Sequence, residues 1–236
     1  FYDGSLKWLM TVIHQQEYGV ICMRAYGFDA DFRLEYPGRF GRDKVFDDVG
    51  QFLSVIGSLV TLISGCVINK NCLSKVDANE FCGRNLVQVH LVIEAALNLK
   101  KNLYSSRYHI ACKRNNSGGY DYVEVFVEHL GDILDAYQVR GLTRQSILAF
   151  DKRMLLGHLP FYLFKQRLSN VGDQQANASR LKLRYASLWR FWILLMPIVS
   201  MPRFIAIFWG GACTAIGRIR YGDFLRGLYF LRHKIR

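Results

Sequence analysis

The segment SLKWLMTVIHQ (residues 5–15) and the segment YGVICMRA (residues 18–25) indicate the fold class of this chain. Leu6, Leu9 and Ile13 recur at helical spacing in the first segment, which predicts an amphipathic helix. The second segment is a short, nearly continuous apolar run, which is typical of a strand buried on both faces. A helix followed by such a strand is a repeating unit of α/β folds.

The same alternation continues along the chain. Further helices are predicted over residues 49–59, 85–99 and 122–137, and further strands over residues 62–69 and 104–114. Beyond Gly141 only helices are predicted, over residues 142–164 and 181–195. Between these two helices, residues 169–179 have the polar composition of a linker. We therefore predict an α/β domain over residues 1–140, followed by an all-helical, membrane-associated extension over residues 141–236.

Positive charge is concentrated at the C-terminal end of the chain. The chain has 31 Lys and Arg residues against 19 Asp and Glu, and residues 180–236 hold 11 of the basic residues but only one acidic residue, Asp223. Such an excess indicates an anionic partner, either nucleic acid or a phospholipid surface. The apolar content of 51% and the presence of only 4 prolines exclude a disordered tail.

Apolar and aromatic residues accompany these charges. Residues 191–202 and 204–216 are apolar stretches separated by Arg203, and each is shorter than the ~20 residues that span a bilayer as a helix. The tryptophans of this region are Trp189, Trp192 and Trp209. Residues 221–236 predict a basic amphipathic helix, so the pattern favours helices lying on an anionic membrane surface. It disfavours nucleic acid, for which no recognition motif is present. Ordinary helices packed on the domain, with a solvated basic face, are the alternative.

Motifs for metal or phosphate chemistry are weak. Asp29 and Asp31 form an Asp-x-Asp motif after a predicted strand, a pattern that can hold a divalent cation. The arginines around them favour a solvated loop of mixed charge instead. The six cysteines show no zinc spacing and indicate reduced thiols. Residues 115–119 match no phosphate-binding glycine motif and predict a turn. No metal ligand is therefore assigned within the chain.

A resemblance to a known family rests on four segments. In chain order they are FYDGSLKWLMTVI (residues 1–13), FLSVIGSLVTLISGCVINKNCL (residues 52–73), EFCGRNLVQVHLVIEAAL (residues 80–97) and KRNNSGGYDYVEVFVEHL (residues 113–130). As an ordered set they resemble the C-terminal half of family 2 glycosyltransferases, in particular the abequosyltransferase-like bacterial sugar transferases. The resemblance covers residues 1–137.

The resemblance implies the C-terminal part of a GT-A type, Rossmann-like glycosyltransferase domain. Its partners would be a nucleotide-sugar donor and a lipid-linked or cell-surface glycan acceptor. A divalent metal, Mg²⁺ or Mn²⁺, is implied for the complete enzyme, with its ligands mostly in an Asp cluster expected ahead of Phe1. The implied location is peripheral, at the cytoplasmic face of the bacterial inner membrane. Such a fragment would lack the nucleotide-binding half and would be inactive alone. The alternative is a non-enzymatic scaffold that presents its basic tail to lipid.

Several residues acquire expected roles from this resemblance. The family's Glu-Asp pair is absent, and Arg84 and Asn85 stand at about its place, so the catalytic base is expected among neighbouring groups. The candidates are Asp77, Glu80 and, as a less favoured substitute, His90. The residues expected to bind substrate are Ser64, Gly83, Asn85, Gln88, Asn115 and Asn116. An inverting transfer needs a carboxylate that removes the proton of the acceptor hydroxyl, which favours Asp77 and Glu80 over His90.

Overall fold

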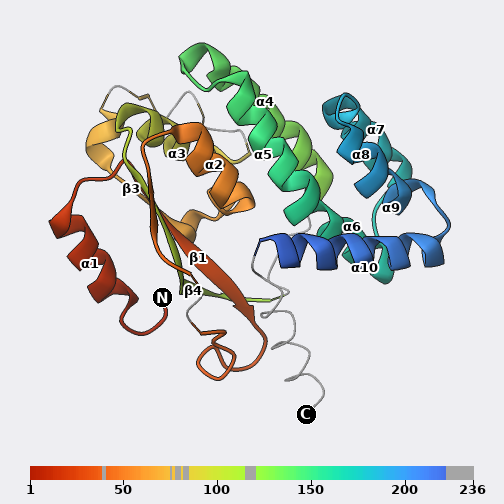
Figure 1. Cartoon of the computed structure of the whole chain (residues 1–236), viewed down its shortest axis with the longest axis horizontal. Helices are drawn as coiled ribbons and strands as arrows, with labels where there is room; N and C mark the ends of the chain where they lie inside the picture. Colours follow the sequence, from red (N-terminus) through yellow and green to blue (C-terminus); the bar gives the residue numbers. More distant parts are fainter. Residues whose placement is uncertain (39–40, 75, 78–80, 82–84, 115–120, 222–236) are drawn as a thin grey trace. The chain divides into compact units, whose positions relative to one another are not determined.

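A computed structural model describes residues 1–38, 41–74, 76–77, 81, 85–114 and 121–221 (Figure 1). The chain divides into two compact units. The first, which we call the sheet unit, comprises Phe1–Gly119 and Ala136–Ser146. The second, the helical unit, comprises Tyr120–Asp135 and Ile147–Arg236. The predicted α/β class is confirmed, because a mixed four-stranded sheet is combined with helices.

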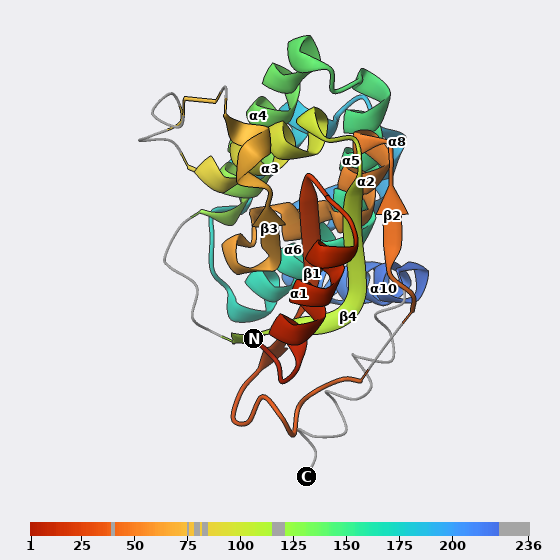
Figure 2. The same cartoon turned by 90° about the vertical axis from the view of Figure 1, so that its left-hand side faces the viewer.

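The sheet is built around one parallel pair of long strands. These are β1 (Val20–Phe28) and β4 (Asn102–Lys113), which lie side by side at its centre (Figure 2). The short strands β2 (Lys44–Phe46) and β3 (Cys66–Ile68) pair antiparallel with β4 and β1, and the strand order is β2-β4-β1-β3. Residues 20–23 of β1 are all buried, as expected for a continuous apolar run between two layers.

Helices cover both faces of this sheet. Figure 1 shows α1 (Ser5–Gln15) on one side, and α2 (Val49–Ile56) and α3 (Val87–Asn98) on the other. Leu9 of α1 packs against Ile21 and Met23 of β1 and against Leu103 of β4. Asp48 caps α2, because its carboxylate accepts a hydrogen bond of 2.7 Å from the Gln51 N–H group. The helices predicted over 5–15, 49–59 and 85–99 are thus confirmed apart from their ends.

Two predictions for the sheet unit need correction. The strand predicted over residues 62–69 forms only as β3, because residues 57–61 and 63–65 adopt the 3-10 turns η1 (Gly57–Thr61) and η2 (Ile63–Gly65). Gly57 has a φ of +52°, which ends α2 and redirects the chain. In addition, the sequence predicts no strand at the position of β2. Its three residues are too few to produce a recognisable alternating pattern.

The helical unit contains η5 (Glu124–His129, a π-helical turn), nearly all of α4 (Leu130–Ala136) and most of α5 (Arg144–Gly157). It also contains α6 (Leu159–Ser169), α7 (Gln174–Tyr185), α8 (Trp189–Leu194), α9 (Met196–Ser200) and α10 (Arg203–Arg220). The linker predicted over residues 169–179 is wrong, because α7 already begins at Gln174. The carboxylate of Asp173 accepts hydrogen bonds from the Gln175 and Ala176 N–H groups and so caps this helix. A polar helix start and a linker have the same composition, which explains the error.

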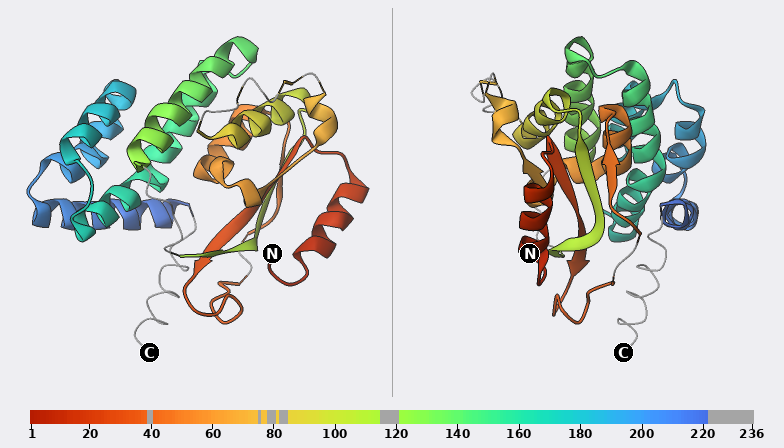
Figure 3. Two further views of the ribbon diagram at one scale, coloured as in Figure 1. Left: turned by 180° about the vertical axis from the view of Figure 1, so that it is seen from behind. Right: turned by 60° about the vertical axis from the view of Figure 1, so that its left-hand side comes forward.

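Helix α10 packs on α6 and the end of α5 through small residues (Figure 3). Its buried positions are Ala206, Gly210, Cys213 and Gly217. A Cβ atom on Gly217 would lie only 2.1 Å from the carbonyl oxygen of Leu156. The close approach of these backbones therefore requires glycine at this position. No helix in the described part of the chain is both long and apolar enough to cross a membrane.

This packing predicts different outcomes for two neighbouring glycines. Gly217→Ala should lower the free energy of unfolding by about 1–3 kcal/mol, because backbone atoms must move apart. In Gly211→Ala the new Cβ would lie 3.7 Å from Phe164, an ordinary contact, so the variant should be neutral or more stable by up to about 1 kcal/mol. Urea unfolding of both variants measures the difference. Equal effects of the two substitutions would contradict the packing described for α10.

Candidate functional site

The described candidate residues lie around the start of α3 and the turns before β3. Ser64 lies in η2 and is exposed. Asp77 and Asn85 are exposed in the segment before α3, and Gln88 and His90 lie in its first turns. The remaining candidates, Glu80, Gly83, Asn115 and Asn116, lie outside the described residues.

Gln88 joins α3 to the segment that carries Ser64. Its side-chain amide donates a hydrogen bond of 2.9 Å to the carbonyl oxygen of Thr61, the last residue of η1. At the other end of α3, the amide of Asn98 donates to the carbonyl oxygen of Cys72, at 2.8 Å. Leu86, directly before the helix, has a φ of +65°, an uncommon value that turns the chain sharply into α3. The turns after α2 and the start of α3 therefore form one local structure.

The ring of His90 is enclosed by aromatic side chains. It stacks on Phe81 with a centroid separation of 4.1 Å and an interplanar angle of 9°, and it lies 5.7 Å from the ring of Tyr137. The Tyr137 hydroxyl donates a hydrogen bond to the His90 carbonyl oxygen. Because His90 is only 5% exposed, an acceptor substrate can reach it only after rearrangement of this region. Asp77 is the described candidate base that is open to solvent.

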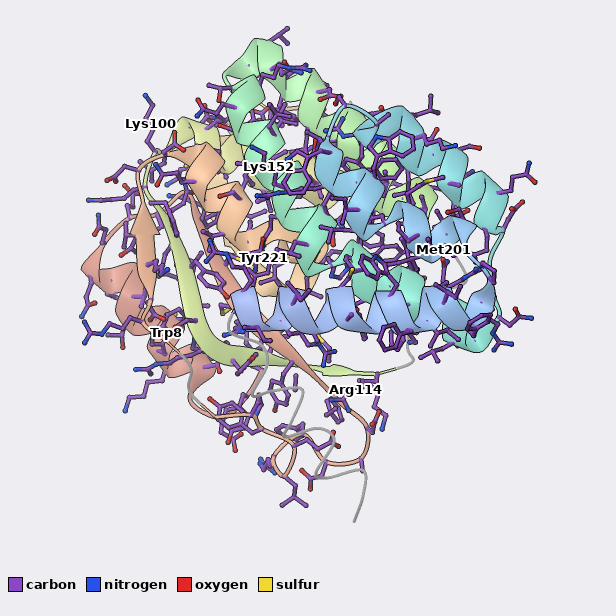
Figure 4. The ribbon with its side chains drawn as sticks, turned by 45° about the vertical axis from the view of Figure 1, so that its right-hand side comes forward. Trp8, Lys100, Arg114, Lys152, Met201 and Tyr221 are labelled. Atoms are coloured by element: carbon purple, nitrogen blue, oxygen red, sulfur yellow. The ribbon has the colours of Figure 1, made fainter. Side chains whose placement is uncertain are left out.

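A second polar cluster, which the sequence analysis did not identify, lies on β4. We call its four members, Ser5, Asp43, Ser105 and His109, the His109 network. The Ser105 hydroxyl donates to the Asp43 carboxylate at 2.8 Å and lies 2.9 Å from His109 Nε2. The Ser5 hydroxyl lies 3.1 Å from His109 Nδ1 and 3.3 Å from the His109 carbonyl oxygen. Trp8 of α1, labelled in Figure 4, stacks on the imidazole at 4.0 Å.

The hydrogen bonds determine the proton positions in this network. The single hydroxyl proton of Ser105 is directed at the Asp43 carboxylate, so His109 Nε2–H must donate to Ser105 Oγ. Nδ1 and the His109 carbonyl oxygen then compete for the single hydroxyl proton of Ser5. Burial lowers the pKa of His109 to about 4, which keeps the ring neutral at pH 7. The network therefore contains a directed chain of hydrogen bonds from His109 through Ser105 to Asp43.

The network compensates for an irregularity in the central strand pair. The register between β1 and β4 shifts on both sides of Arg24, so that Ser106, Arg107 and His109 have no partner on β1. The Asp43 carboxylate accepts a hydrogen bond of 3.1 Å from the Ser106 N–H group. The N–H group of Tyr2 donates to the His109 carbonyl oxygen at 2.8 Å. The network thus fastens the first residues of the chain to the middle of β4.

The Asp-x-Asp motif belongs to a loop stabilised by its own charges. The Glu35 carboxylate accepts hydrogen bonds from the N–H groups of Asp29, Ala30 and Asp31. Burial opposes ionisation, but these hydrogen bonds together with the nearby charge of Arg114 lower the pKa of Glu35. Arg114, labelled in Figure 4, pairs with Asp29 at 2.9 Å and with Glu35 at 3.1 Å. This is the mixed-charge loop given above as the alternative to a metal site.

The carboxylate of Asp31 is likewise used within this loop, because it accepts hydrogen bonds from the Arg33 and Leu34 N–H groups. Among the described residues, no group of three or more His, Cys, Asp and Glu side chains is arranged to hold a metal ion.

Comparisons of this chain with protein-family models, curated proteins and solved structures found no match.

The His109 network predicts a specific pH dependence of stability. The pKa of His109 is about 4 in the folded protein and 6.5 when unperturbed, so the unfolded chain binds the proton first as the pH falls. The stability contributed by the neutral ring is complete above pH 6.5 and is lost progressively between pH 6.5 and about 4, with a slope of about 1.4 kcal/mol per pH unit.

Urea unfolding between pH 4 and 7 tests this dependence. His109→Gln should reduce the slope of the unfolding free energy against pH by about 1.4 kcal/mol per pH unit, which corresponds to one proton. This reduction is expected whatever the effect of the substitution on stability at pH 7. His14→Gln, at an exposed position of α1, is the control. A slope that is the same in wild type and His109→Gln would show that His109 is not held neutral by burial.

Proposed function

We propose that this chain is the acceptor-side part of a GT-A type, family 2 glycosyltransferase. It would transfer a sugar from a nucleotide-sugar donor to a lipid-linked or cell-surface glycan acceptor. The order of elements in the sheet unit supports the proposal. Residues 1–13 contain most of α1, and residues 52–73 run from α2 through β3 to η3 (Lys70–Leu73). Residues 80–97 contain nearly all of α3, and residues 113–130 begin at the last residue of β4 and include η5. These are the helix and strand elements on which the resemblance depends.

The observation that best supports the proposal is an open edge of the sheet. Strand β3 has three residues and pairs only with Val20, Ile21 and Cys22 of β1. In the described part of the chain, no strand pairs with the outer side of β3 or with the same side of β1 beyond Cys22. An unpaired edge of this kind can accept further strands. A nucleotide-binding half joined at this edge would complete a larger Rossmann-like sheet.

The chemistry assigned to this chain is proton removal from the acceptor. In an inverting transfer, a carboxylate takes the proton of the acceptor hydroxyl. The hydroxyl oxygen attacks the anomeric carbon of the sugar at the same time, and the nucleoside diphosphate leaves. We assign this role to Asp77, which is exposed in the segment before α3. Asn85, also exposed there, is suited to hydrogen-bond acceptor hydroxyls. The metal would neutralise the charge of the leaving diphosphate. We assign no metal ligand among the described residues.

The transferase proposal predicts the effect of replacing the base. The protein to assay is the chain with any coding sequence upstream of Phe1, supplied with a panel of nucleotide sugars and membrane-derived acceptors. Asp77→Asn should lower kcat by about 10²- to 10⁴-fold with little change in KM, because only proton transfer is lost. Asp47→Asn, at an exposed carboxylate of the same unit, should leave both unchanged.

Two results would contradict different parts of the proposal. Full activity of Asp77→Asn would exclude Asp77 as the base while leaving the transferase assignment intact. Absence of turnover with every nucleotide sugar, from folded protein that still binds vesicles, would instead favour the non-enzymatic scaffold.

A further inference from the structure

Helix α10 has an unusual distribution of side chains. The face that packs on the helical unit carries Ala206, Gly210, Cys213 and Gly217, which are all small. The opposite face carries large apolar residues that are exposed to solvent: Phe204 is 74% exposed, Phe208 78%, Ile216 53% and Ile219 62%. The intervals between them are four, eight and three residues, so at 100° per residue all four fall within about 120° of the helix circumference. An ordinary surface helix buries its large apolar residues and exposes its polar ones. The reverse arrangement in α10 therefore indicates a surface that a binding partner covers.

Helix α8 extends the same kind of surface. Trp189, Trp192 and Ile193 are exposed and lie at the i, i+3 and i+4 positions of one helical face. The indole N–H of Trp209 in α10 donates a hydrogen bond of 2.9 Å to the Ile193 carbonyl oxygen, which fastens the two helices together. We call the exposed apolar residues of these two helices the α8–α10 face. In the right-hand view of Figure 3, α10 is seen nearly end on, with the other helices of its unit on one side of it.

The charges around the α8–α10 face have one sign. No Asp or Glu occurs between Asp173 and Asp223, whereas arginines stand at both ends of α10 and within α8. Arg180 and Arg184, which precede α8, already pair with carboxylates of the helical unit. Arg203 donates to the carbonyl oxygens of Arg167 and Leu168 and so completes the end of α6.

The remaining arginines of the region are Arg190 in α8 and Arg218 and Arg220 in the last turn of α10. Arg190 lies over the ring of Trp189 at 5.6 Å. Arg190 thus adds positive charge beside the exposed Trp189, and Arg218 and Arg220 add it at the end of α10 that carries Ile216 and Ile219, where Arg218 also lies over the ring of Phe161 at 5.1 Å.

We propose that the α8–α10 face binds the surface of an anionic phospholipid bilayer. The phenylalanines and isoleucines would enter the boundary between headgroups and acyl chains, the tryptophans would lie at headgroup depth, and the arginines would contact lipid phosphates. A second copy of this chain fits the face less well, because a symmetric contact would bring arginine against arginine with no carboxylate between them. The proposal holds whether or not the chain transfers sugars.

Vesicle sedimentation of the full chain tests this proposal without any sugar donor. Wild type should bind anionic vesicles of phosphatidylglycerol and phosphatidylcholine (1:3), and it should bind pure phosphatidylcholine vesicles at least tenfold more weakly. High salt should release it from the anionic vesicles. Phe208→Asp should weaken binding to the anionic vesicles at least tenfold, whereas Phe208→Trp should bind as wild type does.

Leu183→Asp is the matched control, because Leu183 is 88% exposed on α7 and the substitution adds the same charge to the same unit. It should bind nearly as wild type does. Equal binding of Phe208→Asp and Leu183→Asp would overturn the proposal. A dimer of the wild-type chain would also overturn it, if sedimentation velocity without lipid detects that dimer and Phe208→Asp dissociates it. A second copy of the chain would then cover the α8–α10 face. Neither result concerns nucleotide-sugar turnover, which is measured separately.

Discussion

The parallel pairing of β1 with β4 is the constraint on which the sheet unit depends. Parallel strands cannot be joined by a tight turn, so the chain between them must form a long crossover. Residues 29–101 supply it and contain β2, α2, β3 and α3. The pairing runs from Ile21 opposite Leu103 to Phe28 opposite Lys113 and is interrupted by the bulge near Arg24. The described candidate residues all lie on the crossover, so their positions follow from this strand pair.

Much of this architecture could be predicted from local sequence, and what could not be depends on distant contacts. Apolar runs and helical spacing predicted β1, β4, α1 and α3. The His109 network escaped prediction because its members are far apart in the chain, and Ser5 and His109 are separated by 104 residues. The available signal was local: the strand predicted over residues 104–114 contains the polar residues Ser105, Ser106 and His109. The turns η1 and η2 escaped because an apolar run specifies burial without specifying backbone conformation.

The same distinction applies to the candidate sites. The sequence indicated that Asp29 and Asp31 lie in a mixed-charge loop, but only the structure shows Glu35 and Arg114 organising that loop. The apolar character of residues 204–216 was evident, whereas the side of α10 that stays exposed depends on where its glycines pack. If both proposals hold, one unit would take the hydroxyl of a lipid-linked acceptor and the other would bind the membrane that contains this acceptor.

The central claim, that the sheet unit is part of a larger sheet, is tested most directly by amide hydrogen exchange. The chain alone should be compared with the chain joined to any coding sequence found upstream of Phe1, at β3 and at residues 23–28 of β1. We expect the amides of these residues that point away from their present partner strands to become markedly more protected in the longer protein, because new strands pair with the unpaired edge, while α7 of the helical unit exchanges equally in both. Identical exchange along β1 and β3 in the two proteins would contradict it.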